Sequence, residues 1–326
     1  MSPPATSDDT PGGGAVGRGA EPLVHPDVSF LSDYGHADEF VGVVRSVLKA
    51  LAPGVDVVDI THDIAPFDVR GGSLALARSV QYLCPGVVMA VVDPGVGTAR
   101  RAVAVEVGDG SSYLVGPDNG LLAPAVSMAG GATRAVVLDN TEHHLSAPGP
   151  TFDGRDVFAP AAALLCRGID LEHLGTEIDT ASLMPGMLPL SRAEPDGLHA
   201  EVLWVDRYGN AQLNVDPDEI GDLGATVALE AHQRRSVAVR AETFADVSPG
   251  GIGLIVDSYG LVAVVSARAS AAELTGLAPG DEVLLSAAGD VPTPGGDPET
   301  PAVAVSLGPT RSEGPRENPA AGSEGP

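Results

Sequence analysis

The sequence predicts an α/β fold in which a mostly parallel α/β sandwich domain is followed by a small antiparallel β-barrel domain. In residues 28–190, short apolar strands alternate with longer helical segments, which is the pattern of parallel βαβ units. The run Met89–Val92 has no polar interruption, as is typical of a strand covered on both faces. In residues 196–287, short strands follow one another without long helices, which favours a small barrel.

The N-terminal elements follow from hydrophobic spacing and turn signals. The clearest helix, Phe40–Leu51, has apolar residues at helical intervals and ends before a Pro-Gly pair. Further helices are predicted over Gly72–Leu83 and over Val157–Cys166, the latter with Asp156 as its N-cap. The predicted strands are Val28–Leu31, Val55–Ile60, Met89–Val92, Ala102–Val107, Ser112–Val115 and Arg134–Leu138.

The composition changes to Pro, Met and Ser between residues 180 and 195, which predicts a linker. The strands predicted beyond it are Leu198–Val205, Ala211–Val215, Thr226–Glu230, Val237–Val239, Gly253–Val256, Leu261–Val265 and Glu282–Leu285. Residues 1–27 and 288–326 are rich in Pro, Gly and Ser and are predicted to be disordered tails. The predicted domains are therefore 28–190 and 196–287.

The chain is strongly acidic, with a formal net charge of −26 that falls mostly between residues 28 and 287. Nucleic-acid and membrane-surface binding need basic faces, so we expect neither partner. A cationic small molecule would be attracted by the negative electrostatic potential of such a chain. Cys84 and Cys166 lie in apolar contexts and are expected to be buried and unbridged, as in a reducing cytoplasm. Neither a signal-peptide pattern nor an apolar run of about 18 residues is found, so a cytoplasmic protein without a membrane span is expected.

Familiar metal and nucleotide motifs are missing or incomplete. The segment Gly95–Gly97 lacks the third glycine of a dinucleotide fingerprint. His143 and His144 are adjacent, which is poor geometry for ligating one metal, so no protein-built metal site is expected. His62 fits a turn or core histidine better than a catalyst.

Carboxylates stand at the ends of several predicted strands. Asp33 and Asp93 follow strands of the first domain, where ligands of open α/β sheets bind. In the second domain, one strand runs into Asp206 and another into Asp257, each followed by a Tyr-Gly pair. Each carboxylate has two interpretations, a local turn cap or part of a shared site. Arg100 is either a surface charge or a partner that folds back onto Asp93.

Six segments together resemble one family. They are Phe30–Asp33, Val92–Gly97, Gly116–Gly120, Thr151–Asp156, Asp206–Asn210 and Ser258–Gly260. In this order they resemble the S-adenosyl-L-methionine hydroxide adenosyltransferases, relatives of the fluorinating and chlorinating enzymes. The resemblance implies an N-terminal α/β domain, a C-terminal β-barrel, and a homotrimer with sites between neighbouring subunits. It also implies hydrolysis of S-adenosyl-L-methionine to adenosine and L-methionine, with S-adenosyl-L-methionine as substrate and no further cofactor.

The resemblance implies roles for individual residues. Asp33 matches the residue that holds the ribose hydroxyls, and Phe67 stands where the halogenases place a tryptophan against the substrate. Asp38 and Asp206 match positions near the methionine amine, and Asn210 matches the adenine-binding residue. The remaining implied substrate contacts, around the methionine carboxylate, are Ser258, Tyr259 and, with a weaker match, Ser266.

The family's water-activating trio is Asp, Arg and His, and here Asp93 and Arg100 match the first two. The third position is Asp153, where the family pattern has histidine. Aspartate normally accepts hydrogen bonds only, whereas histidine also donates and titrates near neutrality. Two neighbouring carboxylates would push one pKa upward. The alternatives are therefore retained hydrolysis, a non-catalytic adenosine or S-adenosylmethionine sensor, and halide transfer, which is disfavoured because halogenating relatives lack the aspartate at position 93.

Overall fold

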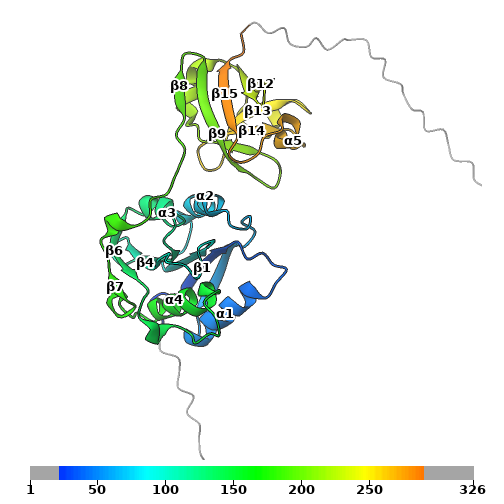
Figure 1. The fold of residues 1–326 in the computed structure, drawn as a ribbon. Coiled ribbons are helices and arrows are strands. Elements are labelled where there is room, and N and C mark those ends of the chain that lie inside the picture. Colours follow the sequence, from blue (N-terminus) through cyan, green and yellow to red (C-terminus); the bar gives the residue numbers. More distant parts are fainter. Residues whose placement is uncertain (1–21, 290–326) are drawn as a thin grey trace, which may run out of the picture. The chain divides into compact units, whose positions relative to one another are not determined.

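The structure is a computed structural model that describes residues 22–289. These residues form an α/β domain followed by a β-barrel domain, so the predicted fold class is confirmed (Figure 1). The predicted tails fall largely on residues 1–21 and 290–326, which lie outside the described residues. Within the predicted N-terminal tail, Val24 and His25 donate their N–H groups to the carbonyl of Cys166 at 2.8 and 3.1 Å. The contacts of the α/β domain thus begin before residue 28.

The α/β domain is built on a seven-stranded sheet with the order β2-β1-β3-β5-β4-β6-β7. The strands are β1 (Asp27–Ser32), β2 (Asp56–Thr61), β3 (Val87–Val91), β4 (Ala102–Val107), β5 (Ser112–Pro117), β6 (Ala132–Val137) and β7 (Thr176–Glu177). The first four in this order are parallel, and β4, β6 and β7 add antiparallel pairings. The expectation of a mostly parallel sheet is corrected to a mixed one. The loop 108–111 that joins β4 to β5 is too short for the crossover that parallel neighbours need.

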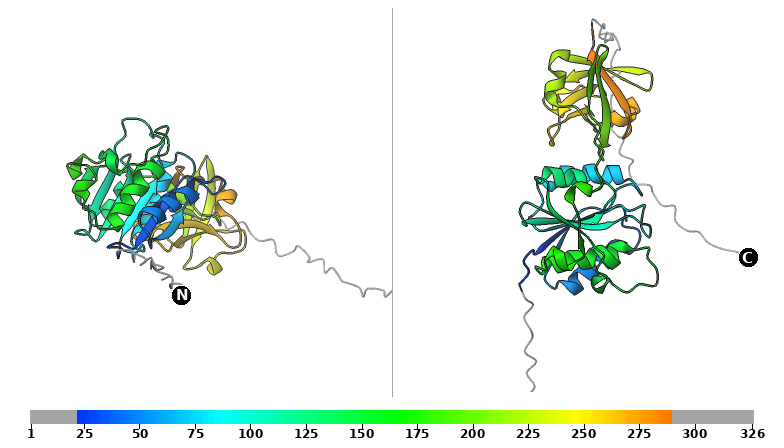
Figure 2. Two further views of the ribbon diagram at one scale, coloured as in Figure 1. Left: turned by 90° about the horizontal axis from the view of Figure 1, so that it is seen from below. Right: turned by 60° about the vertical axis from the view of Figure 1, so that its left-hand side comes forward.

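Helices cover both faces of this sheet. Helices α1 (Phe40–Leu51) and α4 (Ala159–Cys166) pack on one face, and α2 (Val69–Val80) and α3 (Ala123–Met128) pack on the other (Figures 1 and 2). Strand β3 lies between the layers, and all of its residues are buried. Its alternate residues enter the two cores, because side chains alternate along a strand. The prediction of a strand covered on both faces is confirmed.

The helix boundaries show what local sequence patterns specify. Helix α1 has the predicted bounds. Helix α2 begins earlier than predicted because the Asp68 carboxylate accepts the Gly71 N–H at 2.8 Å and caps its first turn. A π-helical turn, η2 (Gly154–Phe158), precedes α4, and Asp156 lies inside it. The predicted N-cap role of Asp156 is wrong, since its carboxylate instead accepts two hydrogen bonds from Arg155, at 2.6 and 2.8 Å.

The second domain is a closed barrel with one added strand. Its sheet has the order β10-β14-β13-β12-β11-β15-β9-β8, and β10 also pairs with β9, which closes the barrel. The strands are β8 (Arg192–Glu194), β9 (Gly197–Val205), β10 (Ala211–Leu213), β11 (Thr226–Ala231), β12 (Arg234–Arg240), β13 (Ile252–Val256), β14 (Val262–Ser266) and β15 (Glu282–Ala287). All pairings are antiparallel except β12 with β13. Val202, Leu213, Val227 and Leu285 are among its core residues.

The remaining elements are short. They are the 3₁₀ turns η1 (Thr141–His143), η3 (Leu171–His173), η4 (Thr180–Ser182), η5 (Pro217–Leu223) and η6 (Phe244–Asp246), and the helix α5 (Ala271–Thr275). The predicted linker contains η4 and β8, and β8 pairs with β9. Across residues 22–289, no helix has the length and apolar character that crossing a bilayer would require.

Candidate active site

The carboxyl ends of β1 and β3 lie side by side and place Asp33 next to the end of β3. The two strands pair in parallel, with Ser32 opposite Val91. The Asp33 N–H donates to the Val91 carbonyl at 3.3 Å, and Asp93 follows two residues later. The two aspartates that follow these strands therefore lie at the same edge of the sheet.

Asp93, Arg100 and Asp153 form one cluster. Arg100 Nε donates to Asp93 Oδ1 at 3.0 Å, and Arg100 Nη2 donates to Asp93 Oδ2 and, at 2.7 Å, to Asp153 Oδ2. The side chains of Asp93 and Arg100 are only 6% and 8% exposed, so this pair is shielded from solvent, while Asp153 is 20% exposed. The Arg100 guanidinium also lies over the Phe158 ring at 5.5 Å. Arg100 is therefore a partner of Asp93 and not a free surface charge.

The turn after β3 brings Arg100 back to Asp93. The Val96 N–H donates to the Asp93 carbonyl at 3.3 Å, and the Thr98 hydroxyl donates to the Gly95 carbonyl at 2.6 Å. Gly97 has φ +75°, a conformation that disfavours residues with a side chain. The turn therefore reverses the chain within seven residues, which is the separation of Asp93 and Arg100.

Burial raises the pKa of the Asp93 carboxyl, Arg100 opposes that shift, and the charge of Asp153 adds to it. The sequence predicts a raised carboxyl pKa from the repulsion of two carboxylates. The direction is confirmed, but desolvation is the larger cause. A carboxylate with a raised pKa is a better proton acceptor than an ordinary aspartate, which suits a general base.

Asp33 and Phe67 are joined directly. The Asp33 Oδ2 atom accepts the Phe67 N–H at 2.9 Å. Phe67 has φ +68°, which is unusual for a bulky residue, and the residue is 72% exposed. An exposed ring on a strained backbone, held by a neighbouring carboxylate, is a feature of ligand-binding loops more than of a packed core.

Three aromatic residues that were not among the predicted site residues, Tyr34, Phe40 and Phe152, pack together beside these groups. The Tyr34 ring packs at 5.6 Å from the Phe152 ring and at 5.8 Å from the Phe40 ring, and Phe40 and Phe152 lie 5.2 Å apart. Tyr34 and Phe152 each stand directly beside a predicted site aspartate in the sequence, Asp33 and Asp153. This adjacency is the signal that could have identified them.

One cavity of about 580 Å³ collects these residues. The predicted site residues that line it are Asp33, Asp38, Phe67, Asp93 and Asp153, together with the unpredicted Tyr34, Phe40, Phe152 and Arg155. The structure thus brings together all the site residues predicted in the α/β domain, with Arg100 paired to two of them.

Two matching turns shape a second cavity, in the barrel domain. Asp206, after β9, accepts the N–H groups of Tyr208 and Asn210 on its Oδ1, at 2.8 and 2.9 Å. Asp257, after β13, accepts the N–H groups of Tyr259 and Leu261 on its Oδ1, at 2.9 and 3.2 Å. These carboxylates are therefore turn caps as well as candidate ligand contacts.

Most site residues predicted in the barrel line this second cavity, of about 510 Å³. They are Asp206, Asn210, Ser258 and Tyr259. The Asn210 amide donates to Asp206 Oδ2 at 2.8 Å, which fixes both side chains. Ser266 lines an adjoining cavity that shares Asn210 and Phe244, and its buried hydroxyl donates to the Gly251 carbonyl at 2.8 Å. In the described residues, the predicted site residues therefore fall into two groups, one in each domain.

Other candidate residues have structural roles. His62 is buried, its Nδ1 lies 2.7 Å from Ser32 Oγ, and burial lowers its pKa, so its interpretation as a core histidine is confirmed. Arg101 pairs with Asp118 and not with the Asp93 cluster. Cys84 and Cys166 are unbridged as predicted, but Cys84 is exposed, contrary to expectation, because it lies in the loop between α2 and β3.

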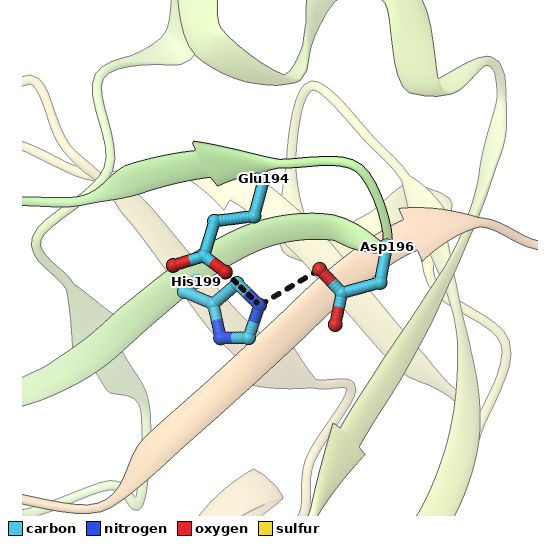
Figure 3. A group of neighbouring side chains, drawn as sticks. All are labelled: Glu194, Asp196 and His199. Atoms are coloured by element: carbon cyan, nitrogen blue, oxygen red, sulfur yellow. Dashed lines mark hydrogen bonds and ion pairs between the residues drawn. The ribbon is translucent and has the colours of Figure 1, made fainter.

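One group in residues 22–289 has metal-ligand spacing, and it lies on the β8–β9 hairpin (Figure 3). His199 Nε2 lies 3.0 Å from Asp196 Oδ1 and 3.8 Å from Glu194 Oε2. Glu194 and Asp196 are exposed, and none of the three residues lines the two cavities described above. The hydrogen bond from His199 lowers the pKa of Asp196. These contacts are those of a surface ion-pair group.

Comparison with known families gives two matches that cover most of the described chain. The SAM hydroxide adenosyltransferase N-terminal domain matches residues 28–175, and the C-terminal domain of the same family matches residues 200–284.

Two named hydrolases are similar over nearly their whole length, and a fluorinase is similar over a shorter part. The (R)-S-adenosyl-L-methionine hydrolase of Salinispora tropica is 46% identical over 262 residues, which cover 80% of this chain and 98% of that protein. The protein of the same name from Thermus thermophilus is 43% identical over 266 residues, which cover 79% of this chain and 98% of that protein. A fluorinase from Actinopolyspora mzabensis is 26% identical over 223 residues, with 61% and 74% covered.

Solved structures share the fold. The crystal structure of an uncharacterized conserved protein from Thermotoga maritima matches with a TM-score of 0.73 at 31% identity, covering 79% of this chain and 99% of that one. The crystal structure of a conserved hypothetical protein from Thermus thermophilus matches with a TM-score of 0.62 at 41% identity, covering 80% and 99%.

Proposed function

This chain belongs to the SAM hydroxide adenosyltransferase family, and from that premise we propose that it hydrolyses S-adenosyl-L-methionine to adenosine and L-methionine. The observation that carries the proposal is that Asp93, which is paired with the shielded Arg100, lines one cavity together with Asp33. Asp93, whose carboxyl pKa is raised, can accept a proton from water. The neighbouring Asp33 carboxylate can accept hydrogen bonds from both ribose hydroxyls.

The proposed reaction is an in-line displacement at the ribose 5′ carbon. A water oxygen forms a bond to C5′, the C5′–S bond breaks, and its electron pair stays on sulfur as the neutral thioether of methionine. The proton lost by water goes to Asp93. The sulfonium needs no acid to leave, so the protein's task is to orient and deprotonate water, where general-base assistance contributes roughly 10²–10⁴-fold. No further cofactor enters this scheme.

The charges around Asp93 favour water over halide as the nucleophile. A halide in the position of the water would face the carboxylates of Asp93 and Asp153. One such contact at 4 Å costs about 4 kcal/mol at an effective dielectric constant near 20. Arg100 offsets part of this cost, but its Nε and Nη2 groups are already engaged by the carboxylates. Hydrolysis therefore suits this cavity better than halide transfer.

Both groups of candidate residues have a part in the proposed site. In the α/β cavity, Asp33 would accept the ribose hydroxyls, Phe67 would contact the substrate, and Asp38 would lie near the methionine amine. In the barrel cavity, the corresponding contacts are Asp206 for the amine, Asn210 for adenine, and Ser258, Tyr259 and Ser266 around the methionine carboxylate. We propose that the two groups meet between neighbouring subunits of a homotrimer, so that each site draws on two copies of the chain.

The configuration at sulfur is part of the proposal. The names of the relatives from Salinispora tropica and Thermus thermophilus specify the R form of the substrate. The sulfonium is a stereocentre, and its two forms point the methyl group in different directions within a fixed pocket. We propose the R form as the preferred substrate of this chain.

The compartment is proposed from the cysteines. Cys84 and Cys166 are unbridged, as is usual for proteins of a reducing cytoplasm. We therefore propose that the enzyme acts in the cytoplasm, where its substrate is a small molecule and neither nucleic acid nor a membrane is a partner.

A product assay in ¹⁸O-labelled water tests the function. The full-length protein is incubated separately with the R and S forms of S-adenosyl-L-methionine, and the products are resolved by chromatography and mass spectrometry. We expect adenosine with the label in its 5′-hydroxyl, unlabelled methionine, and faster turnover of the R form. Asp93→Asn is the matched inactive control.

Three outcomes would contradict the proposal. Calorimetric binding without product after long incubation would make the protein a sensor. A 5′-halo-adenosine formed in the presence of chloride or fluoride would make it a halide transferase. Labelled homoserine together with 5′-methylthioadenosine, in place of labelled adenosine and methionine, would place the attack at the γ-carbon of the methionine part.

A further inference from the structure

The Tyr34 phenol stands in the α/β cavity beside the groups proposed to activate water. Tyr34 lines the same cavity as Asp93 and Asp153. Its oxygen lies against Gly154, the residue after Asp153, so closely that a Cβ atom at position 154 would overlap the phenol oxygen. A residue with a side chain at 154 would therefore displace the hydroxyl, and glycine leaves room for it.

The ring is fixed on several sides. The Phe152 and Phe40 rings pack against it at 5.6 and 5.8 Å, and the Phe30 ring lies at 6.3 Å. The Tyr34 N–H donates to Ser32 Oγ at 3.3 Å, and that oxygen lies 2.7 Å from Nδ1 of the buried His62. The backbone and the ring of Tyr34 are thus both anchored, which leaves the hydroxyl at a defined point.

The hydroxyl is available to a ligand. Among the described residues, no hydrogen bond uses the Tyr34 oxygen. The fully buried side-chain atoms without a partner in the same residues are His62 Nε2, Arg70 Nη2 and Asn214 Nδ2, and the Tyr34 oxygen is not among them. Tyr34 lines the cavity, and its phenol hydrogen has no acceptor among the described residues, so it is free to donate to a ligand bound there.

Burial, together with the charges of Asp33, Asp93 and Asp153, raises the pKa of the Tyr34 phenol above its ordinary value, so the phenol is protonated around neutral pH. It is consequently a donor and not a base. This is the hydrogen-bonding property that Asp153 lacks in the position where the family pattern has histidine.

On the basis of the proposed function, we propose that the Tyr34 hydroxyl donates a hydrogen bond to the oxygen of the attacking water. Water has two hydrogens and two lone pairs. Asp93 and Asp153 accept the two hydrogens, Tyr34 donates to one lone pair, and the remaining lone pair points at C5′. In the reaction Asp93 takes one proton, the O–C5′ bond forms and the C5′–S pair leaves with sulfur, while Tyr34 keeps its proton and stabilises the developing hydroxide character.

Tyr34→Phe tests this role, because it removes one oxygen and keeps the ring packing. Tyr113→Phe is the matched control, since Tyr113 is a part-buried tyrosine on β5 that does not line the cavity. We expect kcat of Tyr34→Phe to fall about tenfold to hundredfold with KM and the melting temperature unchanged. The loss should be equal across roughly pH 6 to 9, because the phenol stays neutral there. The control should retain wild-type kcat.

Each other result has a distinct meaning. A Tyr34→Phe kcat within twofold of wild type, or a loss confined to KM, would overturn the role of Tyr34 and leave the proposed function intact. A loss that disappears at one end of the pH range would also overturn it, because a neutral donor does not titrate. A wild-type protein that forms no adenosine would overturn the proposed function itself, and this role with it.

Discussion

Asp33 holds Phe67 in place: its Oδ2 accepts the Phe67 N–H at 2.9 Å while Phe67 adopts φ +68°. The carboxylate proposed to bind ribose is thus also the group that positions the exposed ring beside it. Strain of this kind costs roughly 1–3 kcal/mol and persists only where surrounding contacts hold it. The hydrogen bond to Asp33 is such a contact, so the ribose and aromatic contacts of the proposed site are coupled through one side chain.

This coupling predicts different effects for two substitutions of Asp33. Asp33→Asn keeps an oxygen that can accept the Phe67 N–H but loses the charge and one acceptor for the ribose diol, so we expect KM to rise several-fold. Asp33→Ala loses both contacts and should raise KM by about tenfold or more beyond Asp33→Asn. Steady-state kinetics of the two variants measure the difference, and equal KM values would contradict the coupling.

Asp93→Asn is expected to abolish turnover without loss of stability. The folded-state pKa of Asp93 lies above its ordinary value, so the folded protein binds this proton more tightly than the unfolded chain. The stability contributed by the protonated form is present at low pH and is lost as the pH rises through the folded pKa. The amide that replaces the carboxyl stays neutral, so the variant does not lose this stability at pH 7. Arg100 also remains paired with Asp153.

Urea unfolding at pH 7 measures this effect. We expect the free energy of unfolding of Asp93→Asn to equal or exceed that of wild type by up to about 1 kcal/mol, with turnover lower by at least about 10². A clear destabilisation would show that the Asp93–Arg100 pair stabilises the fold more than burial of the carboxylate costs.

Asp153→Asn should move the acid limb of the pH–rate profile to lower pH. The charge of Asp153 is one of the causes that raise the pKa of Asp93, so its removal lowers that pKa. A base with a lower pKa is ionised at lower pH, and the limb of kcat/KM should shift by up to about 1 pH unit. Asp118→Asn is the matched control, because Asp118 pairs with Arg101. An unchanged limb would show that the base is not Asp93.

Arg100→Lys should lower kcat far more than Arg101→Lys. A lysine ammonium cannot donate to both carboxylate oxygens of Asp93, as Nε and Nη2 of Arg100 do, while also reaching Asp153 in the same geometry. We expect a loss of about 10²-fold for Arg100→Lys. Arg101 pairs with Asp118 and Ser182 outside the cavity, and its variant should stay within a few-fold of wild type. Similar losses would mean that both arginines act only through the fold.

Subunit mixing tests the proposed homotrimer. Asp93→Asn inactivates the α/β group of site residues, and Asn210→Ala weakens the barrel group. If each site draws on two neighbouring copies, co-expression of the two variants should restore activity at about a quarter of the sites by random association. If one chain supplied both groups, every site in the mixture would carry a defect and activity would stay at the level of the separate variants.

Local patterns predicted some elements well and others poorly. Helix α1 and the doubly covered strand β3 were predicted because apolar spacing and continuous apolar runs are properties of a few adjacent residues. Helix α3 spans only Ala123–Met128, too short for a helical period to stand out. Strands β4 and β6 were predicted, but their antiparallel direction was not, because direction depends on partners and loops, and apolar strands look alike whether parallel or antiparallel.

By itself, the amino-acid sequence determined the two-domain organisation, the aspartates at the strand ends and the family resemblance, because these depend on residue order and short-range spacing. Only the tertiary structure decided that Arg100 binds both Asp93 and Asp153, that Asp33 holds Phe67, and that the Tyr34 hydroxyl lies against Gly154. The last of these contacts joins segments that lie more than a hundred residues apart in the chain. The packing of helices and strands sets the distances between these residues, and a local sequence pattern does not specify that packing.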